Sequence, residues 1–264
     1  MDQYRQIFPH PRLMPYIRYY WILETVYEGI TSERVIPFGA MQLCFYRGNV
    51  VCGTDRLDAG SLLCGQTVNY CDVLTEGKIR IVAVMFRPLG AGAFFAMPMQ
   101  VLAGQKVKAG DLDDPALKEL EQRIAETDGA DTCVALLNRF FLNRLVPLQR
   151  YNQFRLDKVM DVIRENGGNV SVRSLADAAC LSGKQFQRVF AEHVGLNPKE
   201  YIRTVRFQYA LSLLSNTSKG RLTELAYDCG YYDLAHLIGE FKIFSGYTPK
   251  EFLSICTPYS DYFE

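Results

Sequence analysis

The sequence predicts an α+β fold in which a β-rich N-terminal domain is followed by an all-α domain. A chain of 264 residues is long enough for two domains. Short apolar runs bounded by turn residues occupy residues 1 to about 107, as in strands. A segment of helical pattern then occurs twice, at residues 175–202 and 225–253. We expect a first domain over 1–146, a linker over 147–154 and an all-α domain over 155–264.

The clearest strands of the first domain are the runs MQLCFYRGNVVCG, AGSLLCGQ and KIRIVAVMFRPLG, which predict a compact sheet or barrel. Residues 115–127 and 130–146 are predicted to be helical. The second helix places Val134, Leu137, Phe140 or Phe141, and Leu145 on one face. That face packs either onto its own barrel or against a second subunit.

The linker begins at Pro147, which ends the preceding helix, and continues through the polar stretch LQRYNQ.

The duplicated segment predicts two helix-turn-helix units. The Leu-Ala pair of the first copy matches the second at an offset of 50, and the later anchors, including Gly195 and Gly246, match at 51. Each copy consists of a short helix, a tight turn, a second helix ending in Gly and a third helix that begins with Pro. The capping sequences SGKQ, NPKE and TPKE mark three helix starts. Residues 201–214 lack Pro and Gly and are expected to form one longer helix between the units.

Residues 155 to 253 resemble the DNA-binding domain of AraC/XylS-type transcription regulators. The matching text is LADAACLSGKQFQRVFAEHVGLNPKEYIRTVRF followed by LTELAYDCGYYDLAHLIGEFKIFSGYTPKEFL. The resemblance implies two helix-turn-helix units in adjacent major-groove segments of double-stranded DNA, roughly 34 Å apart. It also implies a role in transcription regulation, with RNA polymerase as a further partner.

The first recognition helix is expected to read bases. Helical spacing directs Phe186 and Phe190 inward and leaves Lys184, Gln187 and Arg188 on the opposite face. Arg suits the two acceptors of guanine and Gln suits adenine. The alternative for these three side chains is an ordinary solvated helix face.

The second recognition helix has little to donate, because its stripe consists of Ala235, Ile238, Gly239 and Lys242. His236 is expected either to contact a phosphate or to pack beside the turn. Residues 164–206 carry seven basic and four acidic side chains, net +3, whereas residues 207–253 carry four and five, net −1. DNA affinity is therefore expected to depend mainly on the first unit.

The N-terminal half is similar to the effector-side domains of a subset of AraC-type regulators, through the run RVIPFG at 34–39 and the run FRPLG at 86–90. The resemblance implies a cupin-like barrel that binds a small-molecule effector or forms a homodimer. We expect Arg87 to be an anion partner. The expected lining residues are aromatic: Trp21, Phe38, Phe45 and Phe86. The alternative is that these aromatics form the core and that Arg87 holds a loop.

Composition argues against an enzyme, a metal centre and a cofactor. The chain has three histidines, of which only His10 lies in the β-rich half, and it lacks the usual nucleophile, zinc and phosphate-binding motifs. Cys44, Cys52, Cys64 and Cys71 lack the paired spacing of a zinc site. We expect them to be free thiols in the cytoplasm, since we find no signal peptide or membrane-spanning run, with thiol sensing as the alternative.

The function expected from the sequence is that of a sequence-specific DNA-binding transcription regulator that responds to a small molecule. Two alternatives are an effector-independent regulator controlled by its abundance and a protein-binding adaptor without DNA contact. The effector-independent regulator would show no response to small molecules, and the adaptor would select no DNA.

Overall fold

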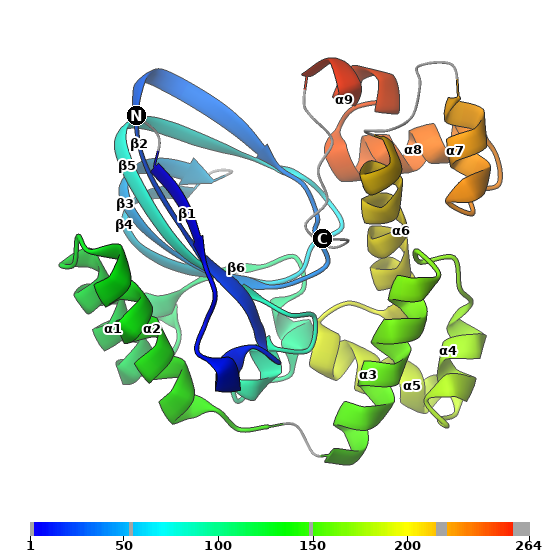
Figure 1. The fold of residues 1–264 in the computed structure, drawn as a ribbon, viewed down its shortest axis with the longest axis horizontal. Helices are drawn as coiled ribbons and strands as arrows, with labels where there is room; N and C mark the ends of the chain where they lie inside the picture. The colour runs from blue at the N-terminus through cyan, green and yellow to red at the C-terminus, as the bar shows by residue number, and fades with distance from the viewer. Residues whose placement is uncertain (1–2, 53–54, 148–149, 215–220, 256–264) are drawn as a thin grey trace.

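A β-rich half and a helical half make up the computed structural model, which describes residues 3–52, 55–147, 150–214 and 221–255 (Figure 1). The strands are β1 (Gln3–Ile7), β2 (Ile17–Val35), β3 (Gln42–Cys52), β4 (Asp55–Cys64), β5 (Cys71–Phe86) and β6 (Lys106–Lys108). The first three helices are α1 (Pro115–Ala125), α2 (Ala130–Arg144) and α3 (Arg150–Glu165). The rest are α4 (Val172–Ala178), α5 (Gly183–Val194), α6 (Pro198–Leu214), α7 (Leu222–Asp228), α8 (Leu234–Ser245) and α9 (Pro249–Ile255). The predicted α+β order is confirmed.

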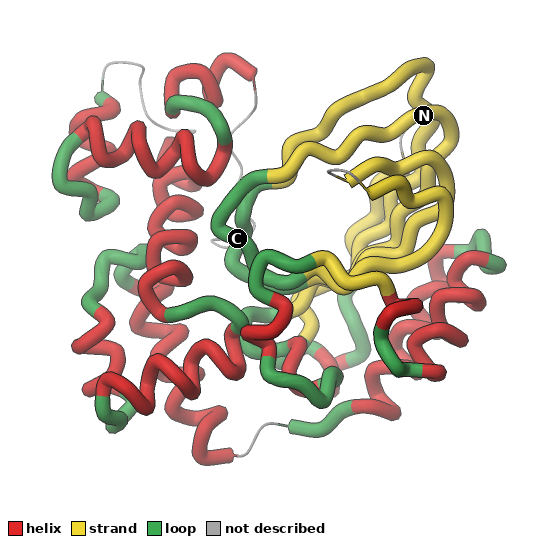
Figure 2. Tube along the Cα trace, turned by 180° about the vertical axis from the view of Figure 1, so that it is seen from behind, coloured by secondary structure: helices red, strands yellow, loops and turns green. Residues whose placement is uncertain are grey.

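The strands form one antiparallel sheet in the order β1-β2-β5-β3-β4-β6. Register shifts interrupt the β2–β5 ladder between Tyr27 and Thr31 and the β3–β5 ladder between Arg47 and Asn49. Such bulges bend strands and increase their twist. The sheet consequently curls strongly, as Figure 2 shows from behind.

The two faces of this sheet have different roles. Along β5, Val82, Val84 and Phe86 belong to a core that includes residues of α1 and α2, whereas Ile81 and Ala83 belong to a second cluster on the other face. This alternation follows from the two-residue period of a strand. One face is therefore packed against helices and the other faces the interior of the barrel.

Helix α2 packs onto its own barrel. Its buried residues, Cys133, Leu136, Leu137, Phe140 and Phe141, join the core that also contains residues of the sheet. Val134 and Leu145 are partly buried against the same core. The apolar face of this helix is thus largely used within one chain.

The helical half repeats itself as predicted. Helices α5 and α8 have 12 residues each, begin after the N-caps Ser182 and Asp233, and end at the left-handed glycines Gly195 and Gly246. Each unit has its own apolar core, and the 17-residue helix α6 contributes residues to both. The predicted connector 201–214 lies within this helix.

Helix α3 begins at Arg150, inside the stretch 147–154 that the sequence predicts as a linker. Residues 150–154 are helical, and residues 148–149 lie outside the described part of the chain. The polar composition of this stretch suggested a linker. However, no Pro or Gly interrupts it after Pro147, and it continues into a helix that buries Leu156, Val159 and Ile163.

Candidate nucleic-acid interface and ligand cavities

Helix α5 presents the predicted base-reading residues to solvent. Phe186, Phe190 and Val194 are buried, and a capping box between Ser182 and Gln185 fixes the start of the helix. The three predicted readers, Lys184, Gln187 and Arg188, are all exposed. The side chain of Arg188 is 72% exposed and its ion pair with Glu192 spans 3.9 Å. An ion pair of this length on a helix surface is weak, so the guanidinium can be redirected to a base.

The start of helix α8 is organised by His236. Asp233 accepts a hydrogen bond from the His236 backbone N–H at 2.7 Å, which is an N-cap. His236 Nδ1 accepts from the Tyr232 backbone N–H at 3.3 Å, and its ring lies edge-on to Tyr231 at 5.2 Å. The imidazole therefore packs beside the turn, as one of the two sequence interpretations stated, while its surface remains exposed.

The exposed stripe of α8 is poor in donors. Ala235, Gly239 and Lys242 are exposed and Ile238 is half-buried. A Cβ atom built on Gly239 would meet no heavy atom within 4 Å. A Cβ atom can therefore be added here without a clash.

Helix α8 is oriented on α6 by an ion pair between Arg203 and Glu240. Arg203 Nη2 donates to Glu240 Oε1 at 2.7 Å, and Arg203 Nε lies 3.1 Å from both carboxylate oxygens. Glu240 is buried, and its hydrogen bonds to Arg203 raise the pKa of that guanidinium. A two-contact pair of this kind fixes direction as well as distance.

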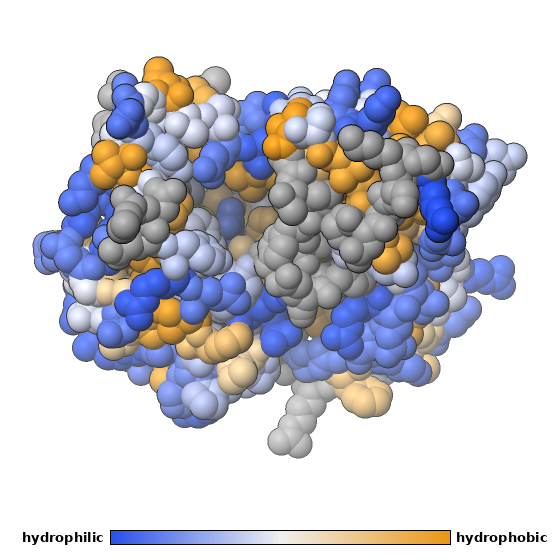
Figure 3. All heavy atoms as spheres, turned by 45° about the horizontal axis from the view of Figure 1, so that its top comes forward, coloured by the Kyte–Doolittle hydropathy of each residue, from blue (hydrophilic) through white to orange (hydrophobic). Residues whose placement is uncertain are grey.

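The barrel interior contains a cavity of about 680 Å³. All of its lining residues lie between Tyr4 and Lys106, in the β-rich half. Figure 3 shows a hollow in the surface with apolar residues beside it. The wall of the cavity is rich in aromatic side chains, including Tyr4, Trp21, Tyr27, Phe38, Tyr46 and Tyr70. This volume and lining are typical of a site for a small apolar molecule.

Four thiols and one ammonium group share this wall: Cys44, Cys52, Cys64, Cys71 and Lys106. Lys106 Nζ lies 2.8 Å from Cys52 Sγ. Burial lowers the pKa of Lys106, but its hydrogen bonds to Cys52 and Cys71 outweigh this effect and raise it. Hydrogen bonding to Cys52, followed by burial, raises the pKa of Cys71. Among the described residues, His, Cys, Asp and Glu side chains form no group that could hold a metal ion.

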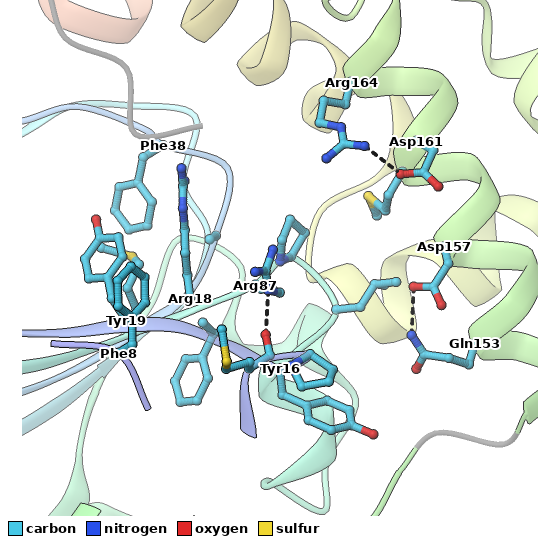
Figure 4. A pocket seen from close by; sticks show the side chains of 18 of the residues that line it. Phe8, Tyr16, Arg18, Tyr19, Phe38, Arg87, Gln153, Asp157, Asp161 and Arg164 are labelled. Atoms are coloured by element: carbon cyan, nitrogen blue, oxygen red, sulfur yellow. Dashed lines mark hydrogen bonds and ion pairs between the residues drawn. The ribbon is translucent and has the colours of Figure 1, made fainter. Parts of the chain in front are cut away.

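A second cavity, of about 600 Å³, lies between the β-rich half and α3. Figure 4 shows Arg18 and Arg87 on one side of it and Asp157, Asp161 and Arg164 on α3. Arg87 Nε donates to the Met14 carbonyl at 2.7 Å. Burial, together with repulsion from Arg18 and Arg164, lowers the pKa of Arg87. A bound anion would relieve this repulsion.

The structure divides the predicted effector residues among three places. Trp21 lines the barrel cavity, Arg87 lines the cleft, and Phe38 lines both. Phe45 lies in the helix-covered core, and Phe86 is buried in that core and also lines the second cavity, beside α3. Strand alternation is the reason, because Phe45 lies between the cavity-lining residues Cys44 and Tyr46.

Sequence reasoning missed Tyr46, Lys106 and Arg18 as lining residues. The alternation along β3 could have identified Tyr46, since it is two residues from Cys44. Arg18 and Lys106 reach their cavities through the curvature of the sheet, which no local pattern encodes.

A family model matches part of each half of the chain. Residues 175–254 match the family described as a helix-turn-helix domain, and residues 5–108 match a family described as a domain of unknown function. The chain is 27% identical over 154 residues to the HTH-type transcriptional activator RhaS of Enterobacter sp., which covers 53% of this chain and 55% of that protein. It is 29% identical over 103 residues to the XylDLEGF operon transcriptional activator of Pseudomonas putida, covering 38% of this chain and 32% of that protein. The chain thus spans about half or less of the length of these curated relatives. Both relatives are transcriptional activators.

Solved structures share the fold of both halves. ToxT from Vibrio cholerae aligns with a TM-score of 0.50 at 9% identity, covering 90% of this chain and 99% of ToxT. Wild-type ToxT with a bound unsaturated fatty acid aligns with a TM-score of 0.52 at 10% identity, covering 92% of this chain and 97% of that one. Within the described residues, every helix is too short or too polar to cross a membrane.

Proposed function

We propose that this chain, which belongs to the AraC/XylS type through its double helix-turn-helix domain, is a sequence-specific DNA-binding transcription regulator that responds to a small molecule. The observation that carries the DNA-binding part is the exposed stripe of Lys184, Gln187 and Arg188 on a capped recognition helix. These residue types bind base edges and phosphates, and the surrounding region carries a net positive charge.

The proposed effector site is the barrel cavity. Its aromatic and thiol wall favours an apolar molecule, and the adjoining cleft offers Arg18, Arg87 and Arg164 to an acidic group. The two cavities have Tyr19, Phe38, Ala40 and Met85 in common, so an occupant of one contacts the wall of the other. The fatty acid bound by ToxT combines an apolar chain with a carboxylate. We propose an effector of the same general chemistry.

Further partners and the location of the protein belong to the same proposal. Contact with RNA polymerase is proposed because the relatives are transcriptional activators, and a cytoplasmic location is proposed because DNA is the partner. A homodimer would need a surface other than the buried face of α2, since that face packs on its own barrel. Sedimentation of the full chain with and without DNA tests the dimer.

Selection of bound fragments from random DNA, followed by sequencing, tests the DNA-binding proposal. We expect an enriched motif whose informative positions cover one helix-turn-helix half-site. Failure to enrich any motif, with the protein folded and recovered, would contradict DNA recognition and favour the protein-binding adaptor.

A thermal-shift series tests the effector proposal. Medium and long apolar carboxylic acids should raise the melting temperature, because a ligand that binds the folded state stabilises it. The Trp21→Ala variant should reduce the shift for acids and for their neutral alcohols alike, whereas Arg87→Ala should reduce only the advantage of the acid. Absence of any shift across the series would favour a regulator controlled by its abundance.

A further inference from the structure

The end of strand β2 and the loop after β4 contact the last turns of the two recognition helices, through Arg34 and Gln66. Gln66 Nε2 donates to the Val194 carbonyl at the end of α5, at 2.6 Å. Arg34 Nη1 donates to the Ser245 carbonyl at the end of α8, at 3.2 Å. Val194 and Ser245 are each the last residue of their helix and are related by the offset of 51. The β-rich half therefore makes the same kind of bond at equivalent positions of the repeat.

The chemistry of a helix C-terminus explains these contacts. The last carbonyls of a helix lack intrahelical donors and carry the negative end of the helix dipole. An amide N–H satisfies the carbonyl of α5, and a guanidinium satisfies that of α8. Both donors come from the other domain and not from the local chain.

In both helices the residue after the contact is a glycine. Gly195 and Gly246 have φ values of 99° and 76°, in the left-handed region that favours glycine. A Cβ atom on Gly195 would lie 2.6 Å from Met41 Cε, and one on Gly246 would lie 2.5 Å from Arg34 Nη1. The β-rich half thus approaches both helix ends to the backbone itself.

The guanidinium of Arg34, which contacts α8, is also held by an ion pair and by two aromatic rings. Asp72 accepts from Arg34 Nε at 2.7 Å and from Nη2 at 2.8 Å. The guanidinium lies between two rings, 4.1 Å from the centroid of Tyr70 and 4.5 Å from that of Tyr247. Tyr70 belongs to the β-rich half and Tyr247 to the helical half, so the stack also joins the two domains.

The connecting helix is held by the same part of the chain. Gln208 Nε2 on α6 donates to the Pro37 carbonyl at 2.5 Å. Pro37 lies in the loop that directly follows Arg34 and the end of β2, and Gln66 lies in the loop after β4. These two loops also line the barrel cavity, through Ile36, Pro37, Phe38, Gly65, Thr67, Asn69 and Tyr70. The same loops therefore line the cavity and contact the helices.

We propose that Gln66 and Arg34 are positioning residues that fix the separation and orientation of the two recognition helices. The β-rich half then determines which spacing of DNA half-sites the protein accepts. A molecule in the barrel cavity changes that spacing by moving the loops, a clause that rests on the proposed effector site. The competing account is that α6 alone holds the two units at a fixed separation.

The test measures the distance between the two recognition helices in the full-length chain without DNA. Spin labels are attached to Lys184→Cys and Lys242→Cys in a background where Cys180 and Cys256 are serine, and pulsed electron paramagnetic resonance gives the distance distribution. The same background without the two introduced cysteines shows whether any remaining thiol is labelled. This readout does not depend on DNA binding, so its failure is distinguishable from failure of the proposed function.

The clamp variant combines Gln66→Met with Arg34→Lys. Methionine removes the amide donor, and also the Gln66 Oε1 atom, which is buried and has no hydrogen-bond partner. Lysine keeps a positive charge near Asp72 but loses the planar fork and the stacking. We expect the distance distribution to broaden or shift while the circular dichroism spectrum remains that of a folded protein.

The matched control combines Gln122→Met with Arg47→Lys. Arg47 uses the same chemistry within the β-rich half, because it donates to the Ala125 carbonyl at the end of α1 and to Asp128. The control should leave the distribution unchanged. An unchanged distribution in the folded clamp variant would overturn the proposal and assign the spacing to α6. If the double variant does not fold, Gln66→Met alone gives the same decision.

A second arm measures DNA spacing. Two selected half-sites are placed at separations that differ by one base pair, and the affinity of the folded chain is measured for each. The clamp variant should reduce the preference for the best spacing by about fivefold, the order expected for losing one or two hydrogen bonds. It should not change affinity for the first half-site alone. If the variant retains the spacing preference, this result would also contradict the proposed positioning role of Gln66 and Arg34.

Discussion

Cys180 has a left-handed backbone conformation, and the equivalent position of the second helix-turn-helix unit is a glycine. Its φ of 52° makes it the one left-handed non-glycine residue in the described part of the chain. The equivalent residue in the second turn, at an offset of 50, is Gly230, with a φ of 72°. A side chain in this region costs free energy because its Cβ crowds the backbone.

Cys180→Gly should therefore raise the free energy of unfolding by about 0.5–1 kcal/mol. Relief of the left-handed strain exceeds the extra entropy that glycine gives the unfolded chain. Urea unfolding of the two proteins at equal pH measures the difference. A loss of stability would mean that the thiol makes a compensating contact. Cys180→Ala, which keeps the Cβ, should give no gain.

Arg188→Ala should lower specific DNA affinity by about 1–3 kcal/mol and relax base choice at one position, because a two-contact pair to guanine is lost. Arg123→Ala is the matched control, since Arg123 also lies in an i,i+4 ion pair but on α1. Fluorescence anisotropy with a selected site measures affinity, and a second selection measures base choice. If the variant binds the same sites equally well, Arg188 is not a reader.

His193 should make stability depend on pH. Burial lowers the pKa of this imidazole below its ordinary value of 6.5, with Glu192 opposing the shift. The unfolded chain then takes up the proton at a higher pH than the folded chain, so stability falls as pH drops through 6.5 toward the lowered pKa. Urea unfolding between about pH 7.5 and 5.5 should show a shallower decline for His193→Gln. Parallel declines would contradict this assignment.

At the scale of elements, capping chemistry was the most informative part of the sequence. The start of α5 after Ser182 and the glycine ends of α5 and α8 were predicted from local residues, because these interactions are local. The length of β2 and the short strands β1 and β6 were not predicted. Strand pairing depends on distant partners, and bulges interrupt the regular alternation within β2.

The aromatic candidates for the effector site show the same limit. Trp21 and Phe38 reach a cavity, but Phe45 lies on the packed face of β3. Aromatic type alone cannot assign a face, whereas alternation along a known strand can. The cavity itself depends on the curvature of the sheet.

The difference between α5 and α8 leads to a prediction for Gly239→Arg. An arginine there should tighten DNA binding and sharpen base selection in the second half-site, through one charge-assisted contact. Gly239 is exposed, and a Cβ atom there would meet no heavy atom within 4 Å. Selection from random DNA, compared between the two proteins, measures the change.

Gly239→Ala separates the contact from the helix. It should stabilise the fold by about 1 kcal/mol through helix propensity without changing base selection. If Gly239→Arg abolishes binding, the glycine is needed for close approach to DNA. If the unmodified protein already shows two equally informative half-sites, the asymmetry between the two recognition helices is absent.

At the scale of the whole molecule, the two domains have separate cores but share a packed interface. The cores of the helix-turn-helix units come mostly from the helical half, but Leu89 is buried in the first core and Val68 packs against both. Hydrogen bonds from Gln66 and Arg34 add to this interface. The helical half should therefore fold without the β-rich half, but with a lower free energy of unfolding.

A fragment beginning near Gln149 tests this arrangement. We expect it to fold, with a free energy of unfolding lower by roughly 2–4 kcal/mol, because it loses the burial of Leu89 and its neighbours against the first core. Thermal and urea unfolding followed by circular dichroism measure the loss.

The affinity of this fragment for the first half-site alone should equal that of the full chain, since Lys184, Gln187 and Arg188 are all retained. Its affinity for the complete site should be weaker, because neither the loops nor a second subunit orders the two readers. Equal affinity of fragment and full chain for the complete site would mean that the β-rich half neither dimerises the protein nor positions its recognition helices.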